Sequence, residues 1–193
     1  MNVAGPTLRV RQLRGVDRVR SLDLSAKRLG DASAAVVGAL VGDNAFCASL
    51  NLASNPISEE GKHALANALL RSTRCTLQGF ACDAFKVLEG AASLDLSKKR
   101  LGAADCQLLA GVLAGALRTN ASLTFIDISV NSIDDESMRT MGTALLSSAT
   151  SKLGALKCDA FNLPGDATSV DLSETSLRPA AATLLAGVLK FNT

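Results

Sequence analysis

Tryptophan and tyrosine are absent from this chain of 193 residues, and six phenylalanines are its only aromatic residues. Hydrophobic residues still make up 48% of the sequence, so the core must consist of aliphatic side chains and alanine. No apolar run approaches the ~20 residues of a membrane span, and the first twenty residues lack the apolar centre of a signal peptide. These absences predict a cytoplasmic protein without a membrane partner.

An excess of charge of one sign is also missing. Twenty basic residues against 18 acidic ones leave a net charge of +2, which provides no general attraction for nucleic acid. We therefore expect no nucleic-acid partner. The five cysteines show no C-x-x-C spacing, which disfavours both a zinc site and a disulfide framework. We expect reduced, mostly buried thiols in a reducing compartment.

Histidine occurs once, as His63, in a segment with helical spacing. A nucleophile and base pair built on histidine would have to use this one residue, and its place on the helix predicts that it faces solvent. No glycine-rich phosphate loop follows a predicted strand. We therefore predict a protein that is not an enzyme, with no catalytic residues, no cofactor and no metal site.

What the chain does contain is a short recurring motif, SLDLS at 93–97. Near copies lie at 21–25 and 169–173, and looser copies at 49–53 and 125–129. Two apolar residues flank one polar residue, the period-2 alternation of a half-buried strand. Aligned on the first apolar residue, eight strand units begin at Leu8, Leu22, Leu50, Phe80, Leu94, Ile126, Leu156 and Val170.

The lengths of these units repeat as short, long, long, and the short units begin at positions 8, 80 and 156. The sequence CDAF at 82–85 recurs at 158–161, and LLAGVL at 108–113 recurs at 184–189, so a larger block is duplicated. We call positions related by this duplication, such as 82 and 158, equivalent positions. Segment 8–13 aligns with 80–85 and is interpreted as a degenerate first unit.

The short units have no room for a helix after the strand and must use extended or tightly turned connections. Helices are predicted in the long units, where alanine and aliphatic residues recur at helical spacing. Their predicted ranges are 31–41, 58–72, 103–119, 134–150 and 178–191.

The pattern L-x-x-L-x-L-x-x-N-x-[IL] is visible at 47–57 and again at 123–133. With its long units, the chain resembles the ribonuclease-inhibitor-like class of leucine-rich repeats, in a protist-type array with short interspersed repeats. The resemblance implies an α/β solenoid, or horseshoe, with parallel strands on the concave face and helices on the convex face. Residues 1–193 are then one domain of about eight strand units, interpreted as a fragment of a longer array.

The outward residues of the strands form a row on the predicted concave face. Carboxylates in such a row could bind a basic partner, or they could hydrogen-bond the neighbouring backbone and serines. Phe125 could contact a partner or pack under the neighbouring unit. The predicted partner-binding residues are Asp23, Asn51, Asp83, Asp95, Phe125, Asp127, Lys157, Asp159 and Asp171.

The predicted function is a non-enzymatic scaffold for protein–protein interaction that binds its partner through the concave strand face. The alternative is a GTPase-activating or sensor and regulatory leucine-rich-repeat module, which would present one exposed arginine at a rim. Arg100 is the nearest candidate, and Arg28 occupies the matching turn. Because the chain stops where another strand should begin, self-association through an open C-terminal end is also expected.

Overall fold

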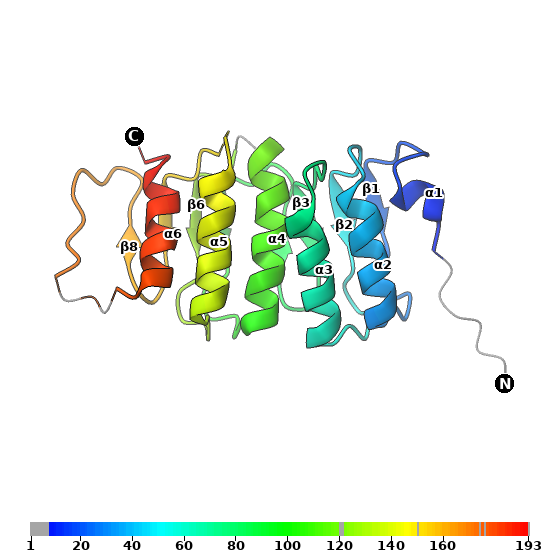
Figure 1. Cartoon of the computed structure of the whole chain (residues 1–193), viewed down its shortest axis with the longest axis horizontal. Helices are drawn as coiled ribbons and strands as arrows, with labels where there is room; N and C mark the ends of the chain where they lie inside the picture. Colours follow the sequence, from blue (N-terminus) through cyan, green and yellow to red (C-terminus); the bar gives the residue numbers. More distant parts are fainter. Residues whose placement is uncertain (1–7, 120–121, 150, 174, 176, 193) are drawn as a thin grey trace.

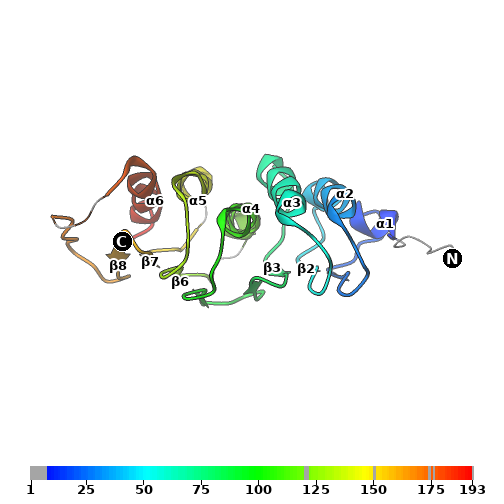
Figure 2. The same ribbon diagram turned by 90° about the horizontal axis from the view of Figure 1, so that it is seen from below.

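The structure is a computed structural model that describes residues 8–119, 122–149, 151–173, 175 and 177–192. The molecule is elongated, with a row of helices lying side by side over a layer of short strands (Figure 1). Seen from below, the helices occupy one side of the molecule and the strands the other (Figure 2). The first and the last of the described residues lie at opposite ends of this row (Figure 1).

Five long helices confirm the predicted ranges to within three residues at each end. Their bounds, with a short additional helix α1, are α1 (Val10–Leu13), α2 (Asp31–Gly42), α3 (Glu59–Arg71), α4 (Ala103–Thr119), α5 (Asp135–Ser147) and α6 (Pro179–Leu189). The starts of α3 and α5 follow from their sequences, since each begins with two acidic residues that favour the positive end of the helix dipole. Asp134 also caps α5, because its side chain accepts the backbone N–H of Ser137 at 2.8 Å.

The strands form two separate sheets of four strands each. The first contains β1 (Ser21–Asp23), β2 (Ser49–Asn51), β3 (Gly79–Ala81) and β4 (Lys86–Val87). The second contains β5 (Ser93–Asp95), β6 (Phe125–Asp127), β7 (Ala155–Lys157) and β8 (Asn162–Leu163). In each sheet the first three strands are parallel and in register, and the fourth runs antiparallel to the third.

The predicted leucine-rich-repeat horseshoe with one continuous parallel sheet is therefore wrong. In the short units that begin at Phe80 and Leu156 the chain turns back on itself, and the returning strand β4 or β8 ends the sheet. The strands expected at Leu8 and Val170 are also wrong. The first region forms helix α1, and the second has no strand among its described residues. The observed fold is α/β, with two small mixed sheets under one layer of helices.

The core lies between the two layers and is aliphatic, as the composition predicts. The middle residue of each long-unit strand points into it, for example Leu50 and Ile126, which are buried. Phe80 and Phe85 fill the space inside the first hairpin unit, with ring centroids 5.6 Å apart.

Two asparagines, Asn55 buried and Asn131 partly buried, join neighbouring units through hydrogen bonds. Asn55 Nδ2 donates to the carbonyls of Leu24 and Leu52 at 2.8 Å, and its Oδ1 accepts the N–H groups of Lys27 and Leu29 at 3.0 Å. The equivalent contacts of Asn131 are donation to the carbonyls of Leu96 and Ile128, and acceptance from the N–H of Leu101. Because these amides are satisfied on both sides, they hold the spacing between units.

Four of the five cysteines are buried, as expected from their spacing, and Cys82 is partly buried. Burial raises the pKa of the Cys47 and Cys106 thiols to about 12, so neither forms a thiolate at neutral pH. Burial also raises the pKa of Cys82 and Cys158. Over the described ranges, the structure contains no helix long and apolar enough to cross a membrane. The predicted cytoplasmic location stays a prediction.

Candidate functional site

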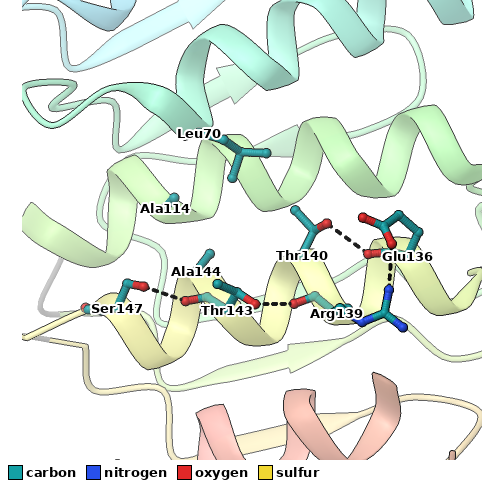
Figure 3. Close-up of a pocket in the computed structure, with 9 residues that line it drawn as sticks. Leu70, Ala114, Glu136, Arg139, Thr140, Thr143, Ala144 and Ser147 are labelled. Carbon is teal, nitrogen blue, oxygen red and sulfur yellow. Dashed lines mark hydrogen bonds and ion pairs between the residues drawn. The ribbon is translucent and has the colours of Figure 1, made fainter. Parts of the chain in front are cut away.

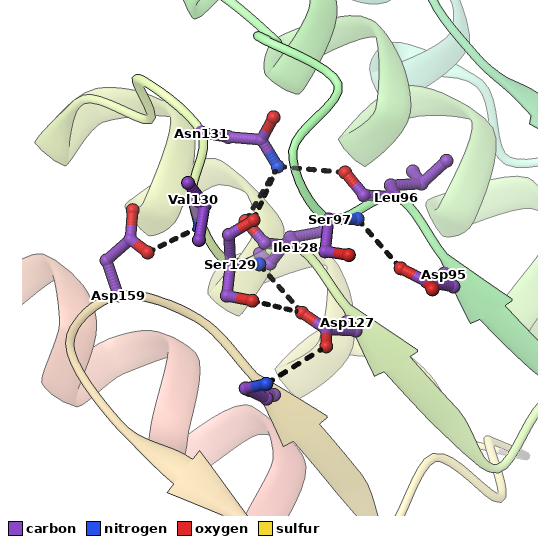
Figure 4. A network of polar contacts seen from close by, with 10 residues as sticks. Asp95, Leu96, Ser97, Asp127, Ile128, Ser129, Val130, Asn131 and Asp159 are labelled. Atoms are coloured by element: carbon purple, nitrogen blue, oxygen red, sulfur yellow. Dashed lines mark hydrogen bonds and ion pairs between the residues drawn. The ribbon is translucent and has the colours of Figure 1, made fainter.

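The second sheet brings three of the predicted residues into one outward row. Because β5, β6 and β7 pair in register, Asp95 lies beside Asp127, and Asp127 lies beside Lys157. The Lys157 ammonium lies 3.5 Å from Asp127 Oδ2. Asp95 is exposed, and Figure 4 shows its side chain on the same side of the sheet as that of Asp127.

Each of these aspartates also holds the turn that follows its strand. Asp127 Oδ1 accepts the backbone N–H of Ser129 at 2.9 Å and its hydroxyl at 2.6 Å (Figure 4). Asp95 Oδ1 accepts the N–H of Ser97 at 2.9 Å. The same N–H contact recurs in the other copies of the motif, at Asp23 with Ser25 and at Asp171 with Ser173. Such turns explain why aspartate recurs at this position whether or not a partner binds there.

These contacts keep the carboxylates ionised. Hydrogen bonds from the serine that follows lower the pKa of Asp23, Asp95 and Asp171 below the usual value. For Asp127, desolvation raises the pKa, but the hydrogen bonds from Ser129 and the charge of Lys157 outweigh it, and the net shift is downward. At neutral pH the row of the second sheet therefore presents two carboxylates and one ammonium.

Asp83 and Asp159 lie in the hairpin turns, beside the strand rows. Each accepts a backbone N–H from the preceding unit at 2.6 Å, Asp83 from Ser54 and Asp159 from Val130. Ser54 and Val130 both have left-handed backbone angles, with φ of 59° and 58°. That conformation is unfavourable for a β-branched residue such as Val130, and its side chain is nonetheless 60% exposed.

Val130 was missed by the sequence prediction. A comparison of the two copies in the sequence could have identified it, because the equivalent residue of the first copy is Ser54 and the turn is otherwise polar. Ser54 adopts the same backbone conformation and makes the same contact. The fold therefore does not require an exposed aliphatic side chain at this position. Val130 therefore belongs with the candidate site.

At four outward positions that the duplication makes equivalent, the second sheet carries the larger or charged residue, whereas at the returning strand the first sheet has Lys86 where the second has Asn162. The pairs are Ser49 and Phe125, Asn51 and Asp127, Ser54 and Val130, and Ala81 and Lys157. Since the backbone register is the same in both sheets, the fold does not require the larger or charged side chains of the second. Asp95, in contrast, matches Asp23 and Asp171. We name the group Phe125, Asp127, Val130 and Lys157 the second-sheet cluster.

The first sheet shows that an amide can replace the carboxylate in this turn. Asn51 Oδ1 accepts the N–H of Ala53 at 3.1 Å, the contact that Asp127 makes with Ser129. Asn51 Nδ2 also donates to Asp23 Oδ1 at 3.1 Å. The charge of Asp127 is therefore dispensable for the turn.

The remaining predicted site residue, Asp171, lies outside both sheets, in a segment that forms no strand in the described part of the chain. Its position neither supports nor opposes self-association, which stays a prediction. Arg28 and Arg100 are both exposed and share the same backbone angle, φ of 57°. Since neither arginine is distinguished from the other, the GTPase-activating alternative gains no support.

His63 is only partly exposed, whereas the sequence predicts that it faces solvent. Its Nδ1 lies against the side-chain oxygen of Gln107 on α4. Within the described ranges, histidine, cysteine and acidic side chains form no group of three that could hold a metal ion.

A groove of about 360 Å³ lies on the helix layer between α3 and α5, over α4, and most of its lining residues come from α5 (Figure 3). It exists because α4 lies closer to the strands than α3 and α5 do (Figure 2). Its hydroxyl groups are used within α5, since Thr140, Thr143 and Ser147 each donate to the carbonyl four residues earlier at 2.8 Å. The groove therefore presents mostly methyl and methylene surface.

No family model matches the chain, and no curated protein matches it. Among solved structures, leiomodin-1 actin-binding site 2 is 11% identical, with a TM-score of 0.41, covering 95% of this chain and 86% of that one. The tropomodulin C-terminal domain of Caenorhabditis elegans is 12% identical, with a TM-score of 0.43, covering 95% of this chain and 90% of that one.

The predicted membership of the ribonuclease-inhibitor-like class is wrong, together with the descriptions of the chain as a leucine-rich repeat and a solenoid. The sheet is divided in two, and each part ends in an antiparallel strand, which is incompatible with a continuous horseshoe of parallel strands. With identities of 11% and 12%, these likenesses transfer no function to this chain.

Proposed function

We propose that this chain is a non-enzymatic protein-binding module that contacts its partner through the outward face of the second sheet. The observation that carries the proposal is the second-sheet cluster, where Phe125, Asp127, Val130 and Lys157 stand in place of Ser49, Asn51, Ser54 and Ala81. The scaffold is the same at both places, so the difference is attributable to a role other than folding.

The composition of this cluster suits a protein interface. Aromatic and aliphatic side chains supply most of the binding energy at interface centres, while charged groups around them set orientation and specificity. Phe125 is half-buried and Val130 is exposed, so both offer apolar surface to a partner. Asp127 and Lys157, 3.5 Å apart, add a fixed pair of opposite charges. Asp95 lies beside them, and in this proposal it belongs to the same contact surface.

The test exchanges the second-sheet cluster for its first-sheet counterparts, as Phe125→Ser, Asp127→Asn, Val130→Ser and Lys157→Ala in one variant. Every substitution has a precedent in the same fold, so the variant is expected to keep the circular dichroism spectrum of the wild type. Proteins captured by the wild type from lysate and quantified by mass spectrometry should fall about tenfold or more, corresponding to the loss of one hot-spot residue or more.

Asp171→Asn is the matched control, since Asp171 makes the same serine turn outside the sheets. It should capture the same proteins as the wild type. If the exchanged variant also captured them undiminished, the second sheet would not be the binding face. A gain of the same partners by the reciprocal first-sheet variant would be the strongest support.

A further inference from the structure

The two hairpin units leave corresponding cavities in the molecule, one between α3 and α4 and one between α5 and α6. The first has a volume of about 160 Å³ and is lined in part by Ile57, Lys62, Cys82 and Asp83. The second has a volume of about 450 Å³ and is lined by the residues at the equivalent positions, Ile133, Met138, Cys158 and Asp159. Both cavities lie where a short unit adds no helix of its own, and their linings differ in side chains and in the segment that precedes α6.

An ion pair lies beside the first cavity. Lys62 on α3 places its ammonium 2.7 Å from Asp105 Oδ1 on α4, and the two side chains are only 23% and 14% exposed. That carboxylate oxygen is buried and accepts no hydrogen bond of favourable geometry, so charge attraction holds the pair. Both charges act on the pKa of Cys82, which places the pair beside the hairpin.

In the second cavity, Met138 replaces Lys62 and Ala181 replaces Asp105, again at equivalent positions. Between these two positions of α5 and α6 the described lining is therefore apolar and carries no equivalent ion pair. The charged groups lie at the exposed edge: Asp135, Asp159 and Arg178. Arg178 Nη1 is 3.7 Å from Asp135 Oδ2. Two carboxylates against one guanidinium give this edge a net negative charge.

We propose that the second cavity receives a lysine side chain of the protein partner, with its alkyl stem against Met138 and its ammonium at the carboxylates of Asp135 and Asp159. The first cavity supplies a precedent for the stem, since Lys62 stands there at the position of Met138; its ammonium meets Asp105, at the position of Ala181, so the proposed ammonium site at the edge belongs to the second cavity alone. The Arg178 guanidinium at this edge would repel a bulkier cation such as arginine. Asp159 accepts the Val130 N–H through Oδ1, so its Oδ2 is the atom proposed to accept the lysine ammonium.

This inference rests on the proposed function only in taking the partner to be a protein. The cavity adjoins the second-sheet cluster, because Asp159 accepts the backbone N–H of Val130 at 2.6 Å. A partner seated on the cluster would therefore lie within reach of the cavity, and one of its lysines could enter from the edge.

The test needs no partner. The probe is Nα-acetyl-lysine N-methylamide, titrated into the ¹⁵N-labelled full chain and followed by amide chemical shifts. We expect saturable shifts at Met138 and Asp159 with a dissociation constant of about 1 mM, as suits a small ligand. The norleucine analogue, which has the stem without the ammonium, should bind at least about tenfold more weakly.

Met138→Lys with Ala181→Asp recreates the ion pair of the first cavity and should abolish the shifts. Asp135→Asn changes only the exposed edge and should weaken binding severalfold, even if the double variant folds poorly. The control is Asp43→Asn, an exposed residue directly after α2, which should bind the probe as the wild type does.

Equal binding of the norleucine analogue, unchanged binding by both variants, or no saturable shift with the lysine probe would each overturn the inference. These outcomes are separate from the capture experiment. A chain that captures partners through the second-sheet cluster but ignores the probe would keep the proposed function and lose this one.

Discussion

The first and second sheets, each with the helices above it, are two copies of one arrangement that differ mainly on their outward faces. Leu50 and Ile126 occupy the same buried position in them, and Asn55 and Asn131 make equivalent contacts. At positions 49, 51, 54 and 81 the first sheet is small or uncharged where the second is aromatic, aliphatic or charged, while Lys86 and Asn162 show the reverse at the returning strand. The comparison thus separates residues that the fold requires from residues that only one copy has.

This comparison divides the aspartates of the strand row into two kinds. Asp95 shares its serine turn with Asp23 and Asp171, so the turn accounts for its presence in every copy. Asp127 makes the same turn, but Asn51 shows that an amide suffices there. The charge of Asp127 and its pairing with Lys157 are therefore specific to the second sheet, and the proposed binding role rests more on them than on Asp95.

The largest effect on stability is expected where the helices of the second copy approach each other more closely than those of the first. A Cβ atom added at Gly142 would lie 2.7 Å from backbone atoms of Leu184 and Thr183. The residue at the equivalent position in the first copy is Ala66, which is buried. We expect Gly142→Ala to lower the free energy of unfolding by about 2 kcal/mol, because α5 and α6 must separate.

Urea unfolding followed by far-ultraviolet circular dichroism measures this change, since the chain has no tryptophan or tyrosine to report by fluorescence. Ala66→Gly is the comparison variant. It should lower the free energy of unfolding by about 1 to 2 kcal/mol, through backbone entropy and the loss of one buried methyl group. A Gly142→Ala variant as stable as the wild type would show that α5 and α6 are no more closely packed than α3 and α4.

A smaller effect of opposite sign is expected at Val130. Asparagine tolerates the left-handed backbone conformation that strains valine, so Val130→Asn should raise the free energy of unfolding by about 1 kcal/mol. The same variant should reduce partner capture, because it removes an apolar side chain that is 60% exposed. Residues kept for binding at the expense of stability behave in this way.

Ser54→Asn, at the equivalent turn of the first sheet, provides the control for Val130→Asn. It should alter neither stability nor capture appreciably, since serine carries no β-branched apolar group there. Capture that survives Val130→Asn would remove Val130 from the proposed interface, and unchanged stability would indicate that the turn relaxes around valine.

The sequence was sufficient for the helices and for six of the strands, because helical spacing and period-2 alternation are local properties. Pairing between strands, in contrast, depends on residues that lie far apart in the sequence. The segment containing Val170 carries the same motif as β5 but forms no strand among its described residues, and the returning strands β4 and β8 have no period to reveal them. The break between the sheets, and with it the error in fold class, follows from those hairpins.

The candidate site was predictable to a similar extent. Asp127, Phe125 and Lys157 could be placed outward from alternation alone, whereas Val130 depends on a backbone angle that side-chain type does not report. The two cavities could not be anticipated either, since their volumes depend on how α3 to α6 pack over the hairpins.

The smallest expected effect concerns acid stability, and it also tests the contrast between Asp127 and Asn51. In the folded chain the pKa of Asp127 is lowered, despite desolvation, by Ser129 and Lys157. A lowered pKa stabilises the folded state at pH values above the unfolded pKa, and this contribution is lost as pH falls through the folded value.

The urea concentration at the unfolding midpoint should therefore decrease as the pH is lowered below about 4, where free aspartate becomes protonated. Asp127→Asn should make that fall shallower. Asn51→Asp should also make it shallower, because a carboxylate beside Asp23 replaces the hydrogen bond from Asn51 with like-charge repulsion, which acid relieves. Midpoints measured from about pH 6 to about pH 3 that fall equally in all three proteins would show that the Asp127 turn contacts do not contribute to stability.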